Sequence, residues 1–313
     1  MARAVSEPPS PHRGLRRALA GIAFTMAIAP TAAARADTPC ATTTAPSSPD
    51  ATHLLLGPRA PRAGERLRVL AARSGSLEGA QLVVHGPDGT VAPENVTVLP
   101  GPTALLAATL PPASAGRFTA RVVAADGSEL ACRTLDVAHE SSPRARRNLG
   151  RFAGVWPIEA EWDARHEVLF SAWIARLFYV EPDAFAGWNP LHRVFRDPAR
   201  NVLFDHLGLG EDSRSPRVVM RADCADTLYG LRAYFAWKMR LPFLVHRCNR
   251  GTAIRGPRCR GVISNLLGVR AYGPDPVRRF SKFMHRVFET VVHSGTTRTM
   301  PDAERSDFYP IAI

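Results

Sequence analysis

The chain has 313 residues, 45% of them hydrophobic, and a formal net charge of +12. This length is sufficient for two domains. The positive charge does not indicate nucleic-acid binding, because no stripe of alternating basic and aromatic residues accompanies the scattered arginines. Lys238 and Lys282 are the only lysines. We therefore expect no nucleic-acid partner, and at most an unspecific attraction to an anionic cell envelope.

The N-terminus has the three parts of a secretory signal peptide. Arginines between positions 13 and 17 precede the apolar run Ala18–Ala29, and Ala34–Ala36 offers the small residues that a signal peptidase reads. The run is shorter than the roughly 20 apolar residues that span a bilayer, and no later segment is long enough. We predict a cleavable signal peptide over residues 1–36, no transmembrane span, and a periplasmic, cell-envelope or extracellular location.

Five cysteines in an exported chain predict disulfides and one remaining thiol. Cys248 and Cys259 flank a loop rich in Gly, Arg and Pro, which a disulfide closes easily. Cys40 and Cys132 lie near the two ends of the first predicted domain. This pairing, one of several that the count allows, leaves Cys224 as the free thiol.

Residues 37–51 read as a flexible leader, and residues 52–140 as a β-sandwich with hairpins at Asp88-Gly89 and Asp126-Gly127. With Pro61–Glu65 placed before a strand, the segment resembles the immunoglobulin-like modules of exported bacterial proteins. The predicted strands are 66–73, 80–86, 104–110, 116–125 and 130–138.

A linker over residues 141–149 separates the sandwich from a second domain, residues 150–313. Apolar residues at helical spacing predict a core-facing helix over Glu159–Tyr179. Residues 180–222 are rich in Pro, Asp, Asn and Gly, and we expect them to be mostly irregular. His192 and His206 lie there, but their spacing does not indicate a metal site.

The most informative stretch is Asp223–Phe243. Asp223 is a natural N-cap, apolar residues follow it at helical spacing, and Leu241-Pro242 ends the helix. Cys224 therefore falls in the first helical turn. The positive end of the helix dipole favours a thiolate there, which is the form of cysteine that acts as a nucleophile.

Asp223-Cys224-Ala225, the helix and its Leu-Pro exit resemble the nucleophile helix of NlpC-type cell-wall peptidases, which are papain-like cysteine hydrolases. Cys224-x-Asp226 also resembles the nucleophile helix of transglutaminase-like proteins. Asp226 departs from the NlpC-type pattern, which usually has Gly at that position. The resemblance implies an α+β papain-like domain after the sandwich, Cys224 as nucleophile and no cofactor. It also implies amide hydrolysis in the envelope, with peptidoglycan stem peptides or another envelope peptide as substrate.

Both families place a histidine base downstream of the nucleophile, oriented by a polar group. His293, with Asp307 or Asp302 beyond it, fits the family order, and we assign His293 as the base and Asp307 as its orienting group. His246 follows the helix too early for either family. His285 lies in a predicted helix, where a solvated or partnered histidine is the usual interpretation.

Only 89 residues follow Cys224, and the chain ends in the apolar run Phe308–Ile313. This ending indicates either a truncated papain-like domain whose catalytic histidine lies beyond residue 313 or a reduced variant of the fold. Two other functions stay open. One is a transglutaminase-like acyl transferase or protease using the same residues. The other is a non-catalytic envelope-binding protein with a degenerate enzyme domain.

Overall fold

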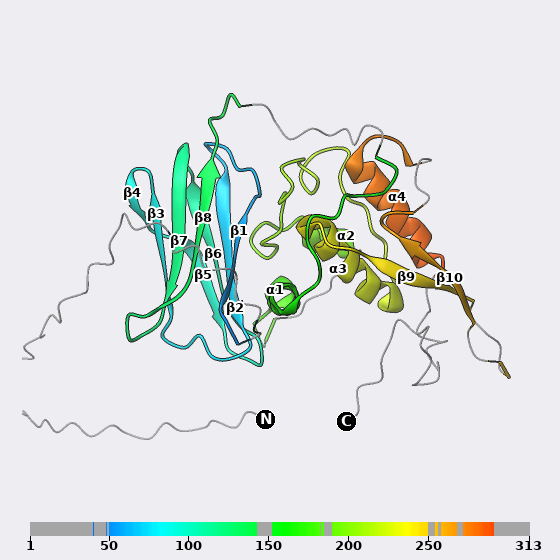
Figure 1. Ribbon diagram of the computed structural model, residues 1–313, viewed down its shortest axis with the longest axis horizontal. Coiled ribbons are helices and arrows are strands. Elements are labelled where there is room, and N and C mark those ends of the chain that lie inside the picture. Colours follow the sequence, from blue (N-terminus) through cyan, green and yellow to red (C-terminus); the bar gives the residue numbers. More distant parts are fainter. Residues whose placement is uncertain are drawn as a thin grey trace, which may run out of the picture. The chain divides into compact units, whose positions relative to one another are not determined.

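The computed structural model describes residues 40, 48, 50–142, 152–181, 183–184, 190–249, 254–255, 258–267 and 272–290. Over these residues the protein is α+β, with antiparallel sheets and a few helices (Figure 1). The predicted signal peptide, most of the leader and most of the predicted linker lie outside the described residues. So do His293, Asp302, Asp307 and the side chains of Cys224, Cys248 and Cys259.

Eight strands form two four-stranded antiparallel sheets, with strand orders β1-β2-β6-β5 and β4-β3-β7-β8. This is the strand order of an immunoglobulin constant-type sandwich, with β4 as an additional strand beside β3. The strands are β1 His53–Gly57, β2 Arg66–Arg73, β3 Gln81–Gly86, β4 Gly89–Val91, β5 Glu94–Leu99, β6 Ala104–Pro112, β7 Gly116–Val123 and β8 Glu129–Val137.

Strands β1, β2 and β6 are buried on both faces. Leu54 and Leu56 of β1 point into the sandwich core, whereas Leu55 belongs to the same apolar cluster as the helices that follow. On β2, Val69 likewise belongs to the sandwich core, and Leu70 belongs to the cluster shared with the helices. Because successive side chains of a strand point to opposite faces, burial on both faces produces these unbroken apolar runs.

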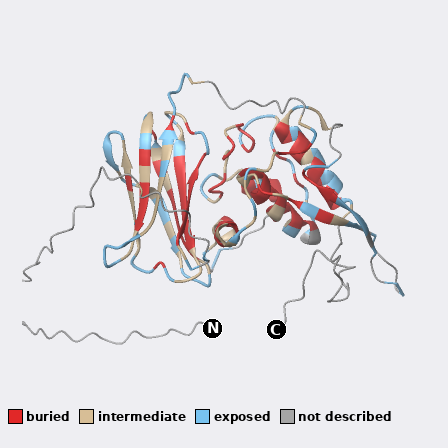
Figure 2. Ribbon diagram, in the orientation of Figure 1, coloured by how far each residue is buried: buried red, intermediate tan, exposed pale blue. Residues whose placement is uncertain are grey.

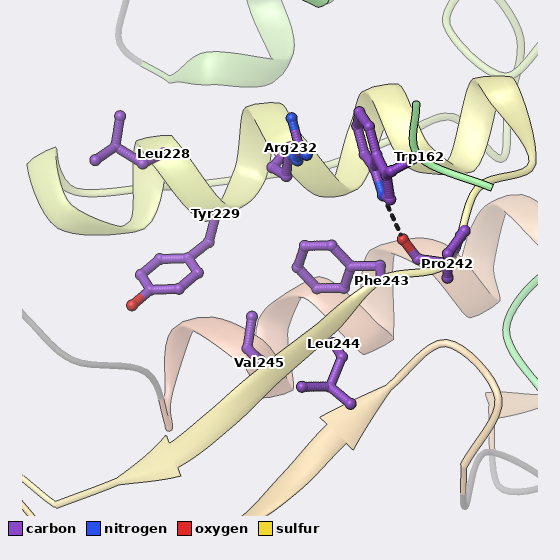
Figure 3. Close-up of a pocket in the computed structure, with 8 residues that line it drawn as sticks. All are labelled: Trp162, Leu228, Tyr229, Arg232, Pro242, Phe243, Leu244 and Val245. Carbon is purple, nitrogen blue, oxygen red and sulfur yellow. Dashed lines mark hydrogen bonds between the residues drawn. The ribbon is translucent and has the colours of Figure 1, made fainter. Parts of the chain in front are cut away.

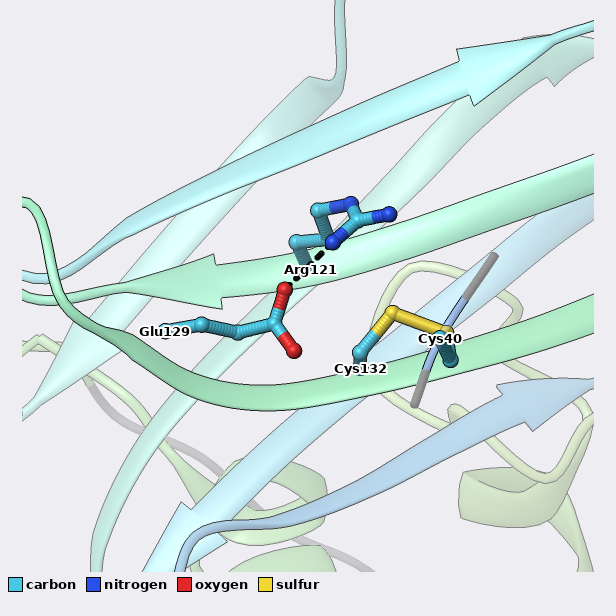
Figure 4. The surroundings of a disulfide bond; sticks show 4 residues. All are labelled: Cys40, Arg121, Glu129 and Cys132. Carbon is cyan, nitrogen blue, oxygen red and sulfur yellow. Dashed lines mark hydrogen bonds and ion pairs between the residues drawn. A yellow bond between two sulfur atoms is a disulfide. The ribbon is translucent and has the colours of Figure 1, made fainter. Parts of the chain in front are cut away.

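A disulfide joins Cys40 of the leader to Cys132 of β8, with 5.4 Å between their Cα atoms (Figure 4). This confirms the predicted pairing. Across the ladder from Cys132, Arg121 of β7 pairs with Glu129 at 2.5 Å. The bond thus fixes a residue of the predicted leader to the β3–β7–β8 sheet.

The second half contains four helices and one hairpin among the described residues. Helices α1 and α4 each bury one face, α3 is buried along most of its length, and α2 is a short turn of helix. Their bounds are α1 Ala164–Phe178, α2 Leu191–Phe195, α3 Cys224–Met239 and α4 Pro276–Phe288, with β9 Leu244–Cys248 and β10 Cys259–Ser264. None of the helices described is long and apolar enough to cross a membrane.

Stacked aromatic side chains hold the helices together. Trp173 of α1 stacks on Tyr234 of α3 with ring centroids 5.6 Å apart, and Trp237 of α3 stacks on Phe280 of α4 at 4.2 Å. Trp156 packs against the same group and donates from Nε1 to the Leu241 carbonyl at 2.8 Å. The aromatic residues predicted as core in the first helix are buried or packed against this core.

The structure departs from the predicted elements in three strands, one leucine and the start of the first helix, which begins at Ala164 after its N-cap Asp163 and not at Glu159. β1, β4 and β5 were not predicted: β1 lacks alternation, β4 has three residues, and β5 is mostly exposed or half-buried. Leu228 has helical spacing with the buried face of α3 but is 57% exposed. A helical periodicity identifies one face of a helix, but it does not show where the neighbouring elements stop covering that face.

Candidate functional site

The beginning of α3 is held by a capping box. The Asp223 carboxylate accepts from the Asp226 backbone N–H at 2.8 Å, and the Asp226 carboxylate accepts from the Asp223 N–H at 3.4 Å. The Thr227 hydroxyl adds a bond of 2.7 Å to the Asp223 carbonyl. Cys224 is therefore the first helical residue, as the sequence predicts, and its backbone is fixed at the positive end of a 16-residue helix.

The segment that leads into Cys224 is anchored by α2. The Nδ1 atom of His192 lies 2.7 Å from the Met220 carbonyl and 3.2 Å from the Met220 amide, and Arg196 donates to the Val218 carbonyl at 2.8 Å. Burial lowers the pKa of His192. His192 thus braces the backbone four residues before Cys224.

Close packing at Gly230 brings α2 and α4 against α3. A Cβ atom at this position would lie 3.0 Å from Leu191 Cδ2 and 3.3 Å from Phe288 Cζ. The missing side chain permits this approach about one and a half turns after Cys224. Contacts from α2 and α4 therefore hold the N-terminal part of α3 in place.

A groove of about 510 Å³ runs along α3 beside β9 (Figure 3). At one end, Arg232 lies 3.3 Å from the ring centroid of Trp162 and forms a bidentate ion pair with Glu167. At the other end, the exposed Leu228 lies one helical turn after Cys224 and lines the groove. The lining residues are Trp162, Leu228, Tyr229, Arg232, Pro242, Phe243, Leu244 and Val245.

A second cleft, of about 480 Å³, lies between residues 219–221 and α4. Its polar lining includes Ser281, which accepts from the Val219 amide at 3.2 Å. His285 lines it too, and its Nδ1 lies 3.3 Å from a carboxylate oxygen of Glu289 on the same helix. This is the partnered, exposed histidine that the sequence predicts for a helical position.

Of the predicted catalytic set, the described residues include only the backbone of Cys224, at the start of α3. The assignments of Cys224 as nucleophile, His293 as base and Asp307 as orienting group remain predictions. His246 lies on β9, opposite Val262 in the β9–β10 ladder. Cys248 lies opposite Cys259 in the same ladder, and a disulfide between them remains a prediction.

A buried charge network that the sequence analysis did not predict lies toward the other end of α3. The Lys238 ammonium contacts Glu211 at 2.5 Å and Asp212 at 2.6 Å, and all three side chains are fully buried. Asp212 also accepts from the Tyr234 hydroxyl at 2.9 Å. Burial raises the pKa of Asp212 to about 6, against the opposing effect of the Lys238 charge.

This network ties the irregular segment before α3 to the helix. Glu211 accepts from the amides of Leu207 and Leu209, and Asp212 accepts from the amide of Asp205. Asp205, Glu211 and Asp212 are close enough to hold a cation, and the Lys238 ammonium already supplies a positive charge there. The sequence signal was a lysine in a chain that otherwise uses arginine almost throughout.

No family model matches the chain, and no curated protein is similar to it. Among solved structures, the crystal structure of the Lin-41 filamin domain aligns with 28% of this chain and 90% of its own, at 18% identity and a TM-score of 0.23. So low a score carries no argument, and the immunoglobulin-type strand order rests on the sheets themselves.

Proposed function

We propose that the protein is an exported cysteine hydrolase that cleaves amide bonds in the cell envelope, with Cys224 as its nucleophile. The observation that carries the proposal is the placement of Cys224 as the first residue of a capped, braced helix. Free backbone N–H groups in a first helical turn favour a thiolate and can stabilise an oxyanion. The assignment of Cys224 as a nucleophile comes from the resemblance of this helix to the nucleophile helix of papain-like hydrolases.

In the proposed reaction the Cys224 thiolate attacks the amide carbonyl carbon, and the carbon–nitrogen bond breaks. The departing amine takes up the proton that the base, assigned to His293 with Asp307 orienting it, has received from the Cys224 thiol, and a thioester remains on Cys224. Water then attacks the thioester, which releases the carboxylic acid and regenerates the thiol. No metal or cofactor takes part in these steps.

The groove beside α3 is the proposed binding site for the substrate. It begins one turn from Cys224 and is largely apolar, so it suits an extended peptide carrying an apolar side chain near the scissile bond. Arg232 is already paired with Glu167, which leaves the groove without an uncompensated positive charge. Peptidoglycan stem peptides are the proposed substrate class, on the strength of the sequence resemblance.

Thiol alkylation from pH 5 to 9, without reductant, tests the nucleophile. Labelling confined to Cys224 that persists below the ordinary thiol pKa of about 8.5 supports the proposal. A Cys224 that is unreactive or in a disulfide overturns it. A Thr227→Ala variant is the matched control, because it alters the same helical turn without removing the thiol.

Purified peptidoglycan and envelope peptides test the reaction itself. New amino groups should appear with wild-type protein and be absent with Cys224→Ala, while Thr227→Ala keeps the activity. Added primary amine that becomes covalently incorporated would assign the acyl-transferase alternative instead. Tight wall association that is unchanged in Cys224→Ala, without any turnover, would assign the binding alternative.

A further inference from the structure

The β9–β10 hairpin belongs to the longest stretch of the chain without a carboxylate. Residues 227–274 contain no Asp or Glu and nine basic residues. Three of the nine are paired with carboxylates from other elements: Arg232 with Glu167, Lys238 with Glu211 and Asp212, and Arg240 with Glu159. The hairpin itself has five arginines between positions 247 and 260.

The described part of the hairpin presents this charge to solvent. Arg247, Arg255, Arg258 and Arg260 are all exposed, and the outer ends of β9 and β10 extend beyond α3 and α4 (Figure 2). Among the described residues, Arg247, Arg258 and Arg260 form no ion pair with a carboxylate. Neighbouring arginines without counter-charges repel one another, so a partner that brings negative charge stabilises the hairpin.

The hairpin also exposes aliphatic side chains among the arginines. Ile254, between the two strands and next to Arg255, is 90% exposed, and Val262 is exposed on β10. A soluble polyanion would use the arginines alone. A bilayer uses both features, because its headgroups attract the cations and its interface accepts the apolar side chains.

We propose that the β9–β10 hairpin is a docking arm for the surface of a bilayer containing anionic phospholipid, with Ile254 entering the headgroup–acyl boundary. The inference is independent of the proposed catalytic function. It assigns a binding partner to the five arginines between positions 247 and 260. Each arginine held near such a surface strengthens binding by about fivefold.

Vesicle co-sedimentation tests the proposal with the full mature chain. One set of vesicles is phosphatidylcholine alone, and in the other a third of the lipid is phosphatidylglycerol. We expect binding only to the second set, and its loss when the salt concentration is raised to about 0.5 M, where the Debye length is a few ångströms. Equal binding to both sets, or to neither, overturns the proposal.

Charge-matched variants locate the surface. Replacing Arg247, Arg258 and Arg260 by Gln should weaken vesicle binding by about a hundredfold. The control replaces three exposed arginines outside the hairpin, Arg193, Arg214 and Arg217, and should lose far less. Equal losses in the two triple variants would show an unlocalised charge effect and overturn the assignment to the hairpin. Circular dichroism of both variants verifies that each is folded.

An Ile254→Trp variant reports on the tip directly. Its added fluorescence should shift to shorter wavelength on anionic vesicles and be quenched by brominated acyl chains. An unchanged spectrum on vesicles that sediment the protein would contradict entry of the tip into the bilayer. Soluble polyphosphate that binds as tightly as the vesicles would assign the arginines to a phosphate polymer and overturn the bilayer proposal.

Discussion

Replacing Lys238 by Met should destabilise the protein severely, because it leaves Glu211 and Asp212 buried without their cation. The ammonium lies 2.5 and 2.6 Å from these carboxylates, and all three side chains are inaccessible to solvent. Breaking a buried ion pair by removing one partner costs about 3–5 kcal/mol, out of a total stability of about 5–15 kcal/mol. At about 2–4 °C per kcal/mol, the midpoint of thermal unfolding should fall by about 6–20 °C.

The loss should depend on pH in a defined direction. Without Lys238, the native state holds protons on the buried carboxylates at higher pH than the unfolded state does, so the variant loses stability as pH rises. The difference from wild type should therefore be larger at pH 8 than at pH 5, measured by urea denaturation. Lys282→Met, at the exposed lysine of α4, is the matched control. A Lys238→Met loss below about 1 kcal/mol, or one equal at both pH values, would refute the reasoning.

Three other predictions concern the cap, the disulfide and the histidines. Asp223→Ala should cost about 1 kcal/mol in urea denaturation, because the Asp226 amide loses its acceptor, whereas Asp223→Ser should retain most of this stability. Replacing Cys40 and Cys132 together by Ser should cost about 4 kcal/mol, given the 92-residue separation; thermal scans with no shift would contradict this. Between pH 7 and 6 the urea midpoint should fall as pH falls, because burial lowers the pKa of four native histidines and the unfolded state then binds more protons. Asp212, with its pKa raised to about 6, acts in the opposite direction but is one group against four, so a rising midpoint would contradict the prediction. These histidines are His53, His166, His192 and His206.

The features that the sequence predicted well are local ones. Asp223 begins α3 because a cap depends on residues within one helical turn, and Gly127 forms its predicted hairpin because a tight turn depends on two or three residues. The Cys40–Cys132 pairing needed only the predicted export signal and the position of the strand. The papain-like assignment rests on about twenty residues and remains a proposal.

The features that the sequence did not predict depend on distant contacts. The buried pairing of Lys238 joins residues 26 and 27 positions apart, and nothing in a helical pattern indicates that a lysine faces inward. Strand β5 is short and exposes its two valines, Val96 and Val98, so its position comes from pairing with β6 and not from burial of an apolar face. The unbroken apolar runs of β1 and β2 did contain a signal, namely that one sheet of the sandwich is covered on both sides.

Because one sheet of the sandwich packs against the helices as well as against the other sheet, the sandwich is not an independent domain. Leu55, Leu70 and Leu105 share one apolar cluster with Trp173 and Leu177, and Arg68 donates to carbonyls of the segment before α3. Protease nicking between residues 142 and 152 should therefore leave two fragments that co-elute in size-exclusion chromatography without denaturant. A truncated chain ending at residue 142 would expose a row of leucines to water and aggregate.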